Sequence, residues 1–489
     1  MKTLSNPLFR AALAAFTLTA CGDDDEHLDD ADAAGTDAAP AVDAPPAVDA
    51  GLDAPPFVAP TPFAVALAAA GPDQLQSAIA GPSNTFYAAG YAAQTLTGPR
   101  LVTVVKLTAA GALDTTFGGG DGIATTAIDF RGGAGEVGIG VQPGGKLIVS
   151  ATIANAANAA DRDVVVTRLN PDGTLDASFG VAGLRVLDLN TAHDNAGTLV
   201  GLDAARGVAI GAGGIIYVYA LQRGEGNAVA GGPRTDTDYT VVKLTVDGTV
   251  DSSFGGGDGK YLQDIQESNA TARGINVLAD GSVLASGYAN SPGLGSVQPV
   301  LFKLTAAGVL DTTFATGGVF HDTVLALQTE VYSVAVHGTN LVTAGYGRAT
   351  GTQNDWVSLR FNATGARDTT WGGAANGAVL IDPSATMVGD NCRNAIALPG
   401  GKTLLLGSTG PGNLPAQDAV FAVLTATGTL DTSFGTGIHI YPLGANGNDQ
   451  FWGGAVSGGL ALAVGYKGGG ATQTDAVNDD AFGLILPLP

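Results

Sequence analysis

Two Asp-x-Asp pairs are the residues of this sequence whose types and spacing could do chemistry. Asp161 and Asp163 form the first pair, and Asp236 and Asp238 form the second. Clustered carboxylates together with backbone carbonyl oxygens are the donors that Ca²⁺ takes in proteins. Neither pair continues into an EF-hand-like loop, and aspartates in such places also cap turns. The pairs are therefore candidate Ca²⁺ ligands, with turn capping as the alternative, and no other metal or cofactor is expected.

The sequence contains no other pattern of catalytic residues. Its five histidines, at positions 27, 193, 321, 337 and 439, lack the spacing of a metalloprotease, and no G-x-S-x-G nucleophile motif occurs. The GGGDG segments 118–122 and 255–259 lack the Lys-Ser/Thr that completes a phosphate-binding loop. We therefore predict no catalytic residues and a protein that is not an enzyme.

Two long segments could carry a specific binding site. They span residues 191–207 and 222–238 and make one interval of the chain longer than the others. Binding residues often lie on loops that a rigid scaffold holds in place. Surface decoration without a ligand is the alternative. The candidate residues at this rim are His193, Asp194, Arg223, Glu225 and Arg234.

The elements that must position these residues are repeated. A phrase of the type G-x-L-D-x-S/T-F-G occurs six times, with its aspartates 57 to 75 residues apart. Self-similarity at a nearly fixed period indicates a repeat architecture. We expect each aspartate to bond backbone N–H groups in a turn, and the aromatic residue three positions later to pack between sheets. These structural residues are Asp114, Phe117, Asp176, Phe179, Asp251, Phe254, Asp311, Phe314, Asp368, Trp371, Asp431 and Phe434.

A basic residue in the strand before the phrase is expected to pair with an acid at the sheet surface. In five copies it is Lys106, Arg168, Lys243, Lys303 or Arg360. The sixth copy has Val423 instead, which leaves Asp431 without this basic partner. The pair is therefore not expected to be essential in every copy.

Each period predicts four short antiparallel strands: a hairpin, a Val-rich strand and, after the phrase, a strand opened by glycine. Seven hairpins accompany six phrases, and the chain stops where a seventh phrase would begin. We therefore predict an all-β, seven-bladed β-propeller of four-stranded antiparallel blades over residues 57–489. A strand at residues 60–68 is expected to complete the last blade and close the ring, since closure removes exposed sheet edges.

The phrase [DN]G-x-LDxSFG after a VV[KR]L strand resembles the delta-60 repeat, a β-propeller-like repeat of bacterial exported proteins. The resemblance covers roughly residues 57–489. Arg367 and Trp371 depart from the leucine and phenylalanine that are usual in this repeat. The resemblance implies a repeat fold and brings no catalytic residues with it.

Residues 1–20 resemble a bacterial lipoprotein signal peptide. Lys2 and Arg10 precede and flank a short apolar stretch that runs into Leu18-Thr19-Ala20-Cys21. The resemblance implies cleavage before Cys21 and its acylation, and two or three acyl chains anchor a protein stably. Residues 21–56 carry eleven acids and no base among Ala and Pro, which predicts a disordered tether. A secretory signal with a chance cysteine is the alternative.

The net charge of −23 argues against nucleic acid as a partner, because such proteins cluster Lys and Arg. Beyond Cys21 the only cysteine is Cys392, so no disulfide framework or zinc site is expected. We predict a monomer that is exported and lipid-anchored to the cell envelope, at the bacterial outer membrane. It would bind or scaffold a protein or glycan partner. The alternative is a propeller-type lyase or hydrolase acting on a polymer in the central funnel, which needs polar groups that converge there.

Overall fold

The regular elements of the described chain are β-strands and short 3₁₀ helices, as the β-branched, glycine-punctuated sequence predicts. The computed structural model describes residues 56–67, 71–130, 135–190, 201–229, 231–290, 296–374, 376–384, 389–411, 417–444, 447–468 and 479–489. The predicted signal peptide 1–20, Cys21, the tether up to residue 55, His193 and Asp194 lie outside these residues. Pro56–Pro489 forms one compact unit, which is described below.

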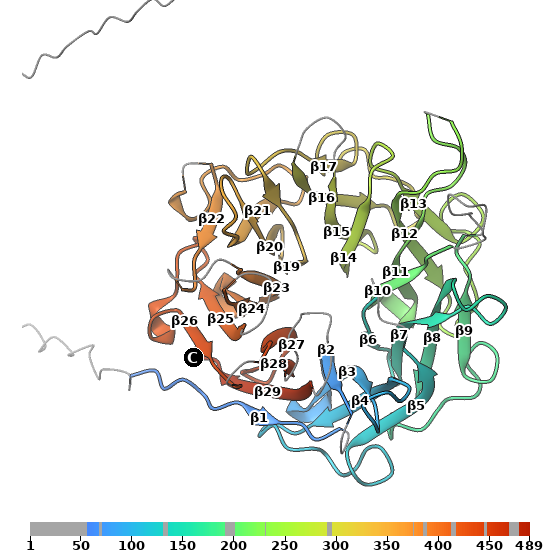
Figure 1. Cartoon of the computed structure of the whole chain (residues 1–489), viewed down its shortest axis with the longest axis horizontal. Helices are drawn as coiled ribbons and strands as arrows, with labels where there is room; N and C mark the ends of the chain where they lie inside the picture. The colour runs from blue at the N-terminus through green and yellow to red at the C-terminus, as the bar shows by residue number, and fades with distance from the viewer. Residues whose placement is uncertain are drawn as a thin grey trace, which may run out of the picture. The chain divides into compact units, whose positions relative to one another are not determined.

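Four-stranded antiparallel sheets follow one another along the chain and surround a common centre (Figure 1). The first sheet is β2 (Asp73–Ala80), β3 (Phe86–Ala92), β4 (Leu101–Leu107) and β5 (Ile123–Asp129). The second is β6 (Gly138–Val141), β7 (Leu147–Ala154), β8 (Arg162–Leu169) and β9 (Leu184–Leu187). The third is β10 (Ala204–Ile210), β11 (Ile216–Arg223), β12 (Thr237–Leu244) and β13 (Lys260–Gln263).

The middle of the chain forms one nine-stranded sheet that consists of two such sets and a bridging strand. The first set is β14 (Ala270–Val277), β15 (Val283–Asn290), β16 (Val297–Leu304) and β17 (Val319–His321). The second set is β19 (Ser333–His337), β20 (Asn340–Arg348), β21 (Asp355–Asn362) and β22 (Ala378–Ile381). The bridging strand β18 (Gln328–Thr329) pairs parallel to β16 and antiparallel to β20, which joins the two sets at one end.

The last two sheets complete the unit. One is β23 (Asn391–Ala397), β24 (Thr403–Thr409), β25 (Asp418–Leu424) and β26 (Ile438–Tyr441). The other is β27 (Gln450–Ser457), β28 (Leu460–Lys467), β29 (Asp480–Pro487) and β1 (Phe63–Ala64), in the order β1-β29-β28-β27. In the part of the predicted strand 60–68 that the structure describes, residues 60–67, the strand is limited to Phe63–Ala64, which pairs antiparallel with Phe482 and Gly483 of β29. The 3₁₀ helices are η1 (Pro82–Asn84), η2 (Ala212–Gly214), η3 (Trp371–Gly373), η4 (Pro399–Gly401) and η5 (Thr432–Phe434).

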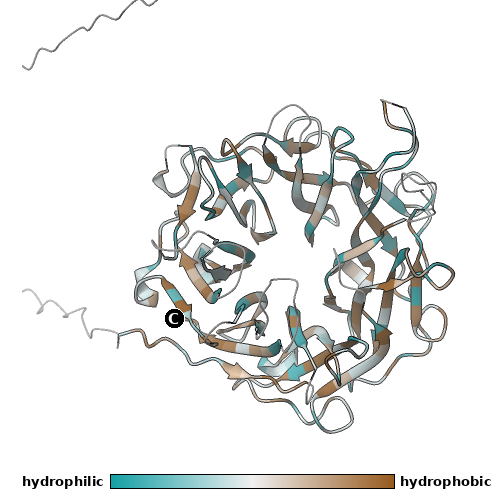
Figure 2. Ribbon diagram, in the orientation of Figure 1, coloured by the Kyte–Doolittle hydropathy of each residue, from teal (hydrophilic) through white to brown (hydrophobic). Residues whose placement is uncertain are grey.

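The hydrophobic core lies between consecutive sheets. Brown, apolar segments follow the strands in Figure 2, and the buried clusters join residues of one sheet to those of the next. One cluster combines Val104 of β4 with Val149 of β7, and another combines Phe86 of β3 with Leu462 of β28. A single sheet cannot cover both of its faces, so each sheet depends on its neighbours.

The repeated phrase forms a turn that locks consecutive sheets together. In the first copy, the Asp114 carboxylate accepts the backbone N–H of Thr116 at 3.0 Å and lies 2.8 Å from Lys106 Nζ. These bonds hold the pKa of Asp114 at about 2, with the bond from Lys106 the largest cause. The aromatic residue three positions on, Phe117, is fully buried. Its ring lies against Gly173 of the next sheet, where an added Cβ would come within 3.0 Å of the ring.

The sixth copy of the phrase does have a basic partner. Lys402, in the hairpin turn of the same sheet, places its Nζ 2.7 Å from the Asp431 carboxylate. The prediction that Asp431 lacks a basic partner is therefore wrong. It rested on the strand position of Val423 alone. The hairpin turn and the phrase lie at the same edge of the sheet, so a lysine in either place reaches the carboxylate, as Lys146 does at Asp176.

Candidate functional site

Residues from every innermost strand line one cavity at the centre of the unit. The innermost strands are β2, β6, β10, β14, β19, β23 and β27 (Figure 1). Five of them contain a β-bulge near the start, and a bulge inserts one extra residue that re-aims its side chain. The bulge residues are Gln76, Arg206, Arg273, Arg393 and Trp452. Val137 and Tyr332 directly precede β6 and β19, and all seven residues line the cavity of about 490 Å³.

Two of the arginines share one carboxylate. Arg206 and Arg273 each donate from Nη1 to Oε1 of Glu136, both at 2.7 Å. Arg273 also donates from Nη2 to the hydroxyls of Tyr332 at 2.9 Å and of Tyr288 at 3.1 Å. Burial lowers the pKa of Arg206, and the neighbouring Arg273 acts in the same direction. Glu136 therefore bridges two sheets and offsets only part of the positive charge at the centre.

The third arginine has aromatic neighbours in place of a carboxylate. The guanidinium carbon of Arg393 lies 4.6 Å from the ring centre of Tyr332 and 4.7 Å from that of Trp452. Its Nε is buried without a hydrogen-bond partner, and no ion pair joins it to a carboxylate of the described residues. Cation–π contacts stabilise the flat faces of a guanidinium but leave the N–H donors at its edge unused. Arg393 is thus a 93% buried cation with free donor capacity at a cavity wall.

A second carboxylate lies near these arginines. Glu330 is buried and accepts a hydrogen bond from Gln328 Nε2 at 2.6 Å. Burial raises the pKa of Glu330, while the charges of Arg273 and Arg393 act in the opposite direction. Even with Glu136 and Glu330 both ionised, three guanidinium groups give the centre a net positive charge. In a chain of net charge −23, this concentration of cations marks the cavity as a site for an anion.

This site was not predicted from the sequence. The hairpins that contain these strands are recognisable there, but no role was predicted for their bulge residues. The signal available was the position itself: Arg206 and Arg273 each precede the glycine that opens the hairpin pattern, and Arg393 and Trp452 stand at the same place in later repeats. The convergence of different strands on one point is not readable from period or spacing, because it depends on how the sheets are arranged around the centre.

The predicted rim residues have other partners in the structure. Arg223 donates from Nη1 to the carbonyl oxygen of Thr235, and Glu225 lies 2.7 Å from Lys260 Nζ. Arg234 is buried and is bonded to aspartates, as described next. Arg223 and Arg234 are not the exposed side chains that a rim binding site requires, and none of these three lines the central cavity.

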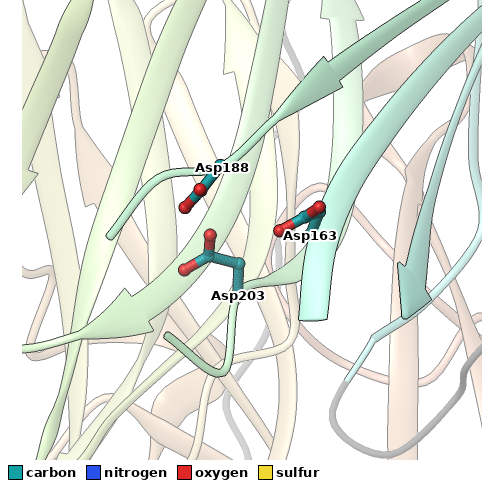
Figure 3. Close-up of side chains that lie close together, drawn as sticks. All are labelled: Asp163, Asp188 and Asp203. Atoms are coloured by element: carbon teal, nitrogen blue, oxygen red, sulfur yellow. The ribbon is translucent and has the colours of Figure 1, made fainter. Parts of the chain in front are cut away.

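The Asp-x-Asp pairs divide into different environments. Asp161 accepts the backbone N–H groups of Gly201 and Leu202, which is a structural role. Asp163 instead faces Asp188 and Asp203, with carboxylate oxygens within 4.8 Å of one another (Figure 3). Asp236 and Asp238 gather with Asp264 around the guanidinium of Arg234, which binds all three.

This architecture is similar to that of known β-propeller proteins. Residues 142–179 and 278–314 match the family described as "Domain of unknown function (DUF5122) beta-propeller". The chain contains β-propeller repeats. The β-propeller domain of the trilobed protease from Pyrococcus furiosus is similar over 87% of this chain and 97% of that chain, with 9% identity and a TM-score of 0.40. No curated protein matches the sequence.

Two solved enzymes also have a similar fold. A glucose dehydrogenase is 12% identical over 73% of this chain and 96% of its own, with a TM-score of 0.39. An endo-arabinase from Bacteroides thetaiotaomicron is 10% identical over 66% of this chain and 96% of its own, with a TM-score of 0.30. The prediction that this protein is not an enzyme is corrected. It depended on the absence of converging polar groups, and polar groups from different sheets do converge at the central cavity.

In the described part of the chain, no helix has both the length and the apolar character needed to cross a membrane.

Proposed function

We propose that this β-propeller binds an acidic glycan in its central cavity, through the carboxylate groups of the sugar. The observation that carries the proposal is Arg393, a buried guanidinium whose edge donors have no carboxylate partner among the described residues. A guanidinium presents a planar fork of donors that matches a carboxylate in a bidentate geometry. Arg206 and Arg273, held by Glu136, keep the surrounding potential positive.

The lining of the cavity favours a saccharide over a small inorganic anion. The cavity of about 490 Å³ has room for a group larger than phosphate. Gln76, Ser77 and Asn276 offer polar groups, while Tyr332 and Trp452 offer aromatic edges beside the arginine. Mixed aromatic and hydrogen-bonding walls around a few placed charges are typical of small-ligand sites.

We further propose a ring of seven blades that the N-terminal segment closes. The pairing of Phe63–Ala64 with β29 supports this proposal, as does a contact that repeats around the unit. The phrase aromatic of one sheet lies against the turn glycine of the next, as Phe117 does at Gly173. The last sheet has no phrase of its own, and Phe63 of its strand β1 lies against Gly111 of the first sheet in the same way.

Export and anchoring through an acylated Cys21 form part of the same proposal. The lipobox-like Leu18–Cys21 segment and the acidic tether support it at the level of the sequence. Such an anchor would hold the propeller at the cell envelope, where acidic glycans are available as ligands.

The test is a calorimetric titration of the full chain with a uronic-acid oligosaccharide and with its neutral counterpart. We expect the acidic oligosaccharide to bind and the neutral one to bind at least tenfold more weakly, because one charge-assisted bidentate contact is worth more than about 1.5 kcal/mol. Arg393→Gln should weaken binding by about tenfold or more. The matched control is Arg367→Gln, at a half-buried arginine that lies outside the cavity and contacts Asn376, and it should leave binding unchanged. Equal binding of both oligosaccharides, or undiminished binding by Arg393→Gln, would refute the proposal.

Cleavage of the bound glycan is the second candidate function. It is favoured by Glu330, a buried carboxyl group whose pKa is raised by burial and which lies near the arginines that would hold a carboxylate of the substrate. Incubation of the full chain with the same oligosaccharide should then produce new reducing or unsaturated ends, and Glu330→Gln should abolish them. Binding without product would leave the first candidate and exclude this one for that substrate.

A further inference from the structure

The interfaces between consecutive sheets contain three acidic clusters built on the same plan. In each, one aspartate is the first or second residue of the third strand of a sheet, and another directly follows the end of the fourth strand. The two flank the last pair of residues that joins these strands, so they lie at equivalent positions of the register. The flanked pairs are Val164 with Leu187, Tyr239 with Gln263, and Trp356 with Ile381.

The third acid distinguishes two of these clusters from the other. In two of them it is contributed by the next sheet, three residues before the bulged arginine of the innermost strand: Asp203 before Arg206, and Asp390 before Arg393. At the corresponding position before Arg273, the chain has Ala270. The cluster of Asp238 and Asp264 therefore lacks an acid from the next sheet.

Where that acid is absent, the chain supplies its own cation. Nη2 of Arg234 lies 2.7 Å from a carboxylate oxygen of Asp238 and 2.7 Å from one of Asp264, and it also contacts Asp236. In this repeat, the space between the aspartates is therefore occupied by a positive group, the guanidinium of Arg234. Around the other two clusters, no Lys or Arg of the described residues forms an ion pair with the acids.

The acids of these two clusters also present unused oxygens. Asp203 is fully buried, and its Oδ1 has no hydrogen-bond partner while Oδ2 accepts the N–H of Leu189. Figure 3 shows the carboxylates of Asp163, Asp188 and Asp203 close together, with that of Asp203 directed toward Asp188. Asp390 is fully buried as well, with Oδ2 unpartnered. A buried carboxylate oxygen without a donor is costly unless a cation binds it.

We propose that Asp163, Asp188 and Asp203 bind one Ca²⁺ ion between two sheets. Asp355, Asp382 and Asp390 bind a second ion in the same way. Their ligand oxygens lie within 4.8 Å of one another, which suits a common ion at the 2.3–2.6 Å bond lengths of calcium. The donors are all oxygens, the set that hard cations take, and the clusters contain neither the histidine nor the thiolate that zinc prefers.

The charges around the first site favour this inference. Asp163 receives its hydrogen bonds from the neutral amide of Asn155, and the nearby Asp161 is bonded to backbone N–H groups. Neither set of bonds brings a positive charge that would neutralise the cluster. The causes that shift the pKa of Asp203 are burial, one backbone hydrogen bond, and repulsion from Asp188, Asp161 and Asp163. Three carboxylates facing one another without a cation repel, and a divalent ion converts that repulsion into a link between sheets.

The test is a calorimetric titration of the full chain, first stripped with EDTA, with CaCl₂ and separately with MgCl₂. We expect two Ca²⁺ ions per chain. Asp203→Asn should leave one site and the double variant Asp203→Asn, Asp390→Asn should leave none. Asp258→Asn, which changes an exposed aspartate of the GGGDG segment 255–259 outside the clusters, should keep both. No heat with millimolar CaCl₂, unchanged stoichiometry in Asp203→Asn, or Mg²⁺ binding as tight as that of Ca²⁺ would overturn the proposal.

A thermal measurement guards against variants that do not fold. In EDTA, Asp203→Asn should melt no lower than the natural chain, because it removes a buried charge and retains an oxygen that can accept the N–H of Leu189. Added Ca²⁺ should raise the Tm of the natural chain more than that of the variant. A variant that unfolds in EDTA while the natural chain does not would show that the carboxylate itself, without an ion, stabilises this interface, and would overturn the proposal.

Discussion

Replacing Glu136 by glutamine should weaken the fold and strengthen ligand binding at the same time. The Glu136 carboxylate accepts two hydrogen bonds of 2.7 Å from Arg206 and Arg273, which lie on different sheets. Removing one partner of a buried ion pair costs roughly 3–5 kcal/mol, and glutamine keeps one acceptor oxygen, so we expect a loss of about 3 kcal/mol. For about 430 folded residues, an unfolding entropy of about 2 cal/mol/K per residue converts this loss into a Tm lower by about 3 °C.

The effect on binding should have the opposite sign. A ligand carboxylate in the cavity would be repelled by the negative charge of Glu136, since two unit charges repel by roughly 1.4 kcal/mol even about 12 Å apart at an effective dielectric constant of about 20. Removing the charge should therefore tighten binding of the uronic-acid oligosaccharide by at least about tenfold, the equivalent of 1.4 kcal/mol.

Differential scanning calorimetry measures the first effect and isothermal titration the second. Glu225→Gln is the matched control, because the same chemical change is made at a carboxylate that is 49% exposed. An exposed substitution of this kind changes stability by less than about 0.5 kcal/mol. If Glu136→Gln lowered both stability and affinity, Glu136 would contact the ligand directly, and the reasoning from net charge would be refuted.

Three further predictions concern the scaffold and its charges. Gly308→Ala should lower the free energy of unfolding, measured by chemical denaturation, by about 3 kcal/mol. The φ of Gly308 is +78°, and an added Cβ would lie 2.6 Å from the Phe254 ring. The control Gly144→Ala should cost only about 1 kcal/mol, because Gly144 has a φ of +88° but open space around it. Phe63→Ala should cost about 2 kcal/mol in the same assay, because it removes the ring that contacts Gly111. The control is Val58→Ala, at a residue that is 81% exposed, and an equal loss of stability from both variants would contradict the prediction. Burial raises the pKa of Asp203 to about 8, above the unfolded value of about 3.9, so its protonated form stabilises the fold at low pH. In EDTA that contribution should disappear as the pH rises from about 4 to about 8, so the Tm of the natural chain should fall relative to that of Asp203→Asn over the same range, and a constant difference would contradict this.

Much of the scaffold could be predicted from the sequence because the residues that determine each strand and turn lie within a single repeat. The turn residues, the Val-rich strands and the phrase all lie within one period, so hairpins such as 138–153 were recognisable without knowledge of their neighbours. The partner of Asp431 could not be predicted in this way. A strand position and a hairpin turn both reach the same carboxylate in space, and only the folded sheet shows that Lys402 replaces the missing basic residue.

The candidate site could not be predicted because its residues share a position without sharing a type. In chain order, the equivalent places of the innermost strands hold Gln76, Val137, Arg206, Arg273, Tyr332, Arg393 and Trp452, so no motif repeats. The phrase, in contrast, keeps its residue types because it makes the same contact between each sheet and the next. Positions that vary while the scaffold stays constant are free to encode recognition. We therefore propose that the variation at the bulge, more than the long loops at the rim, sets what this propeller binds. Exchanging Arg393 and Gln76 between repeats should then move the proposed anion site around the centre without altering the fold.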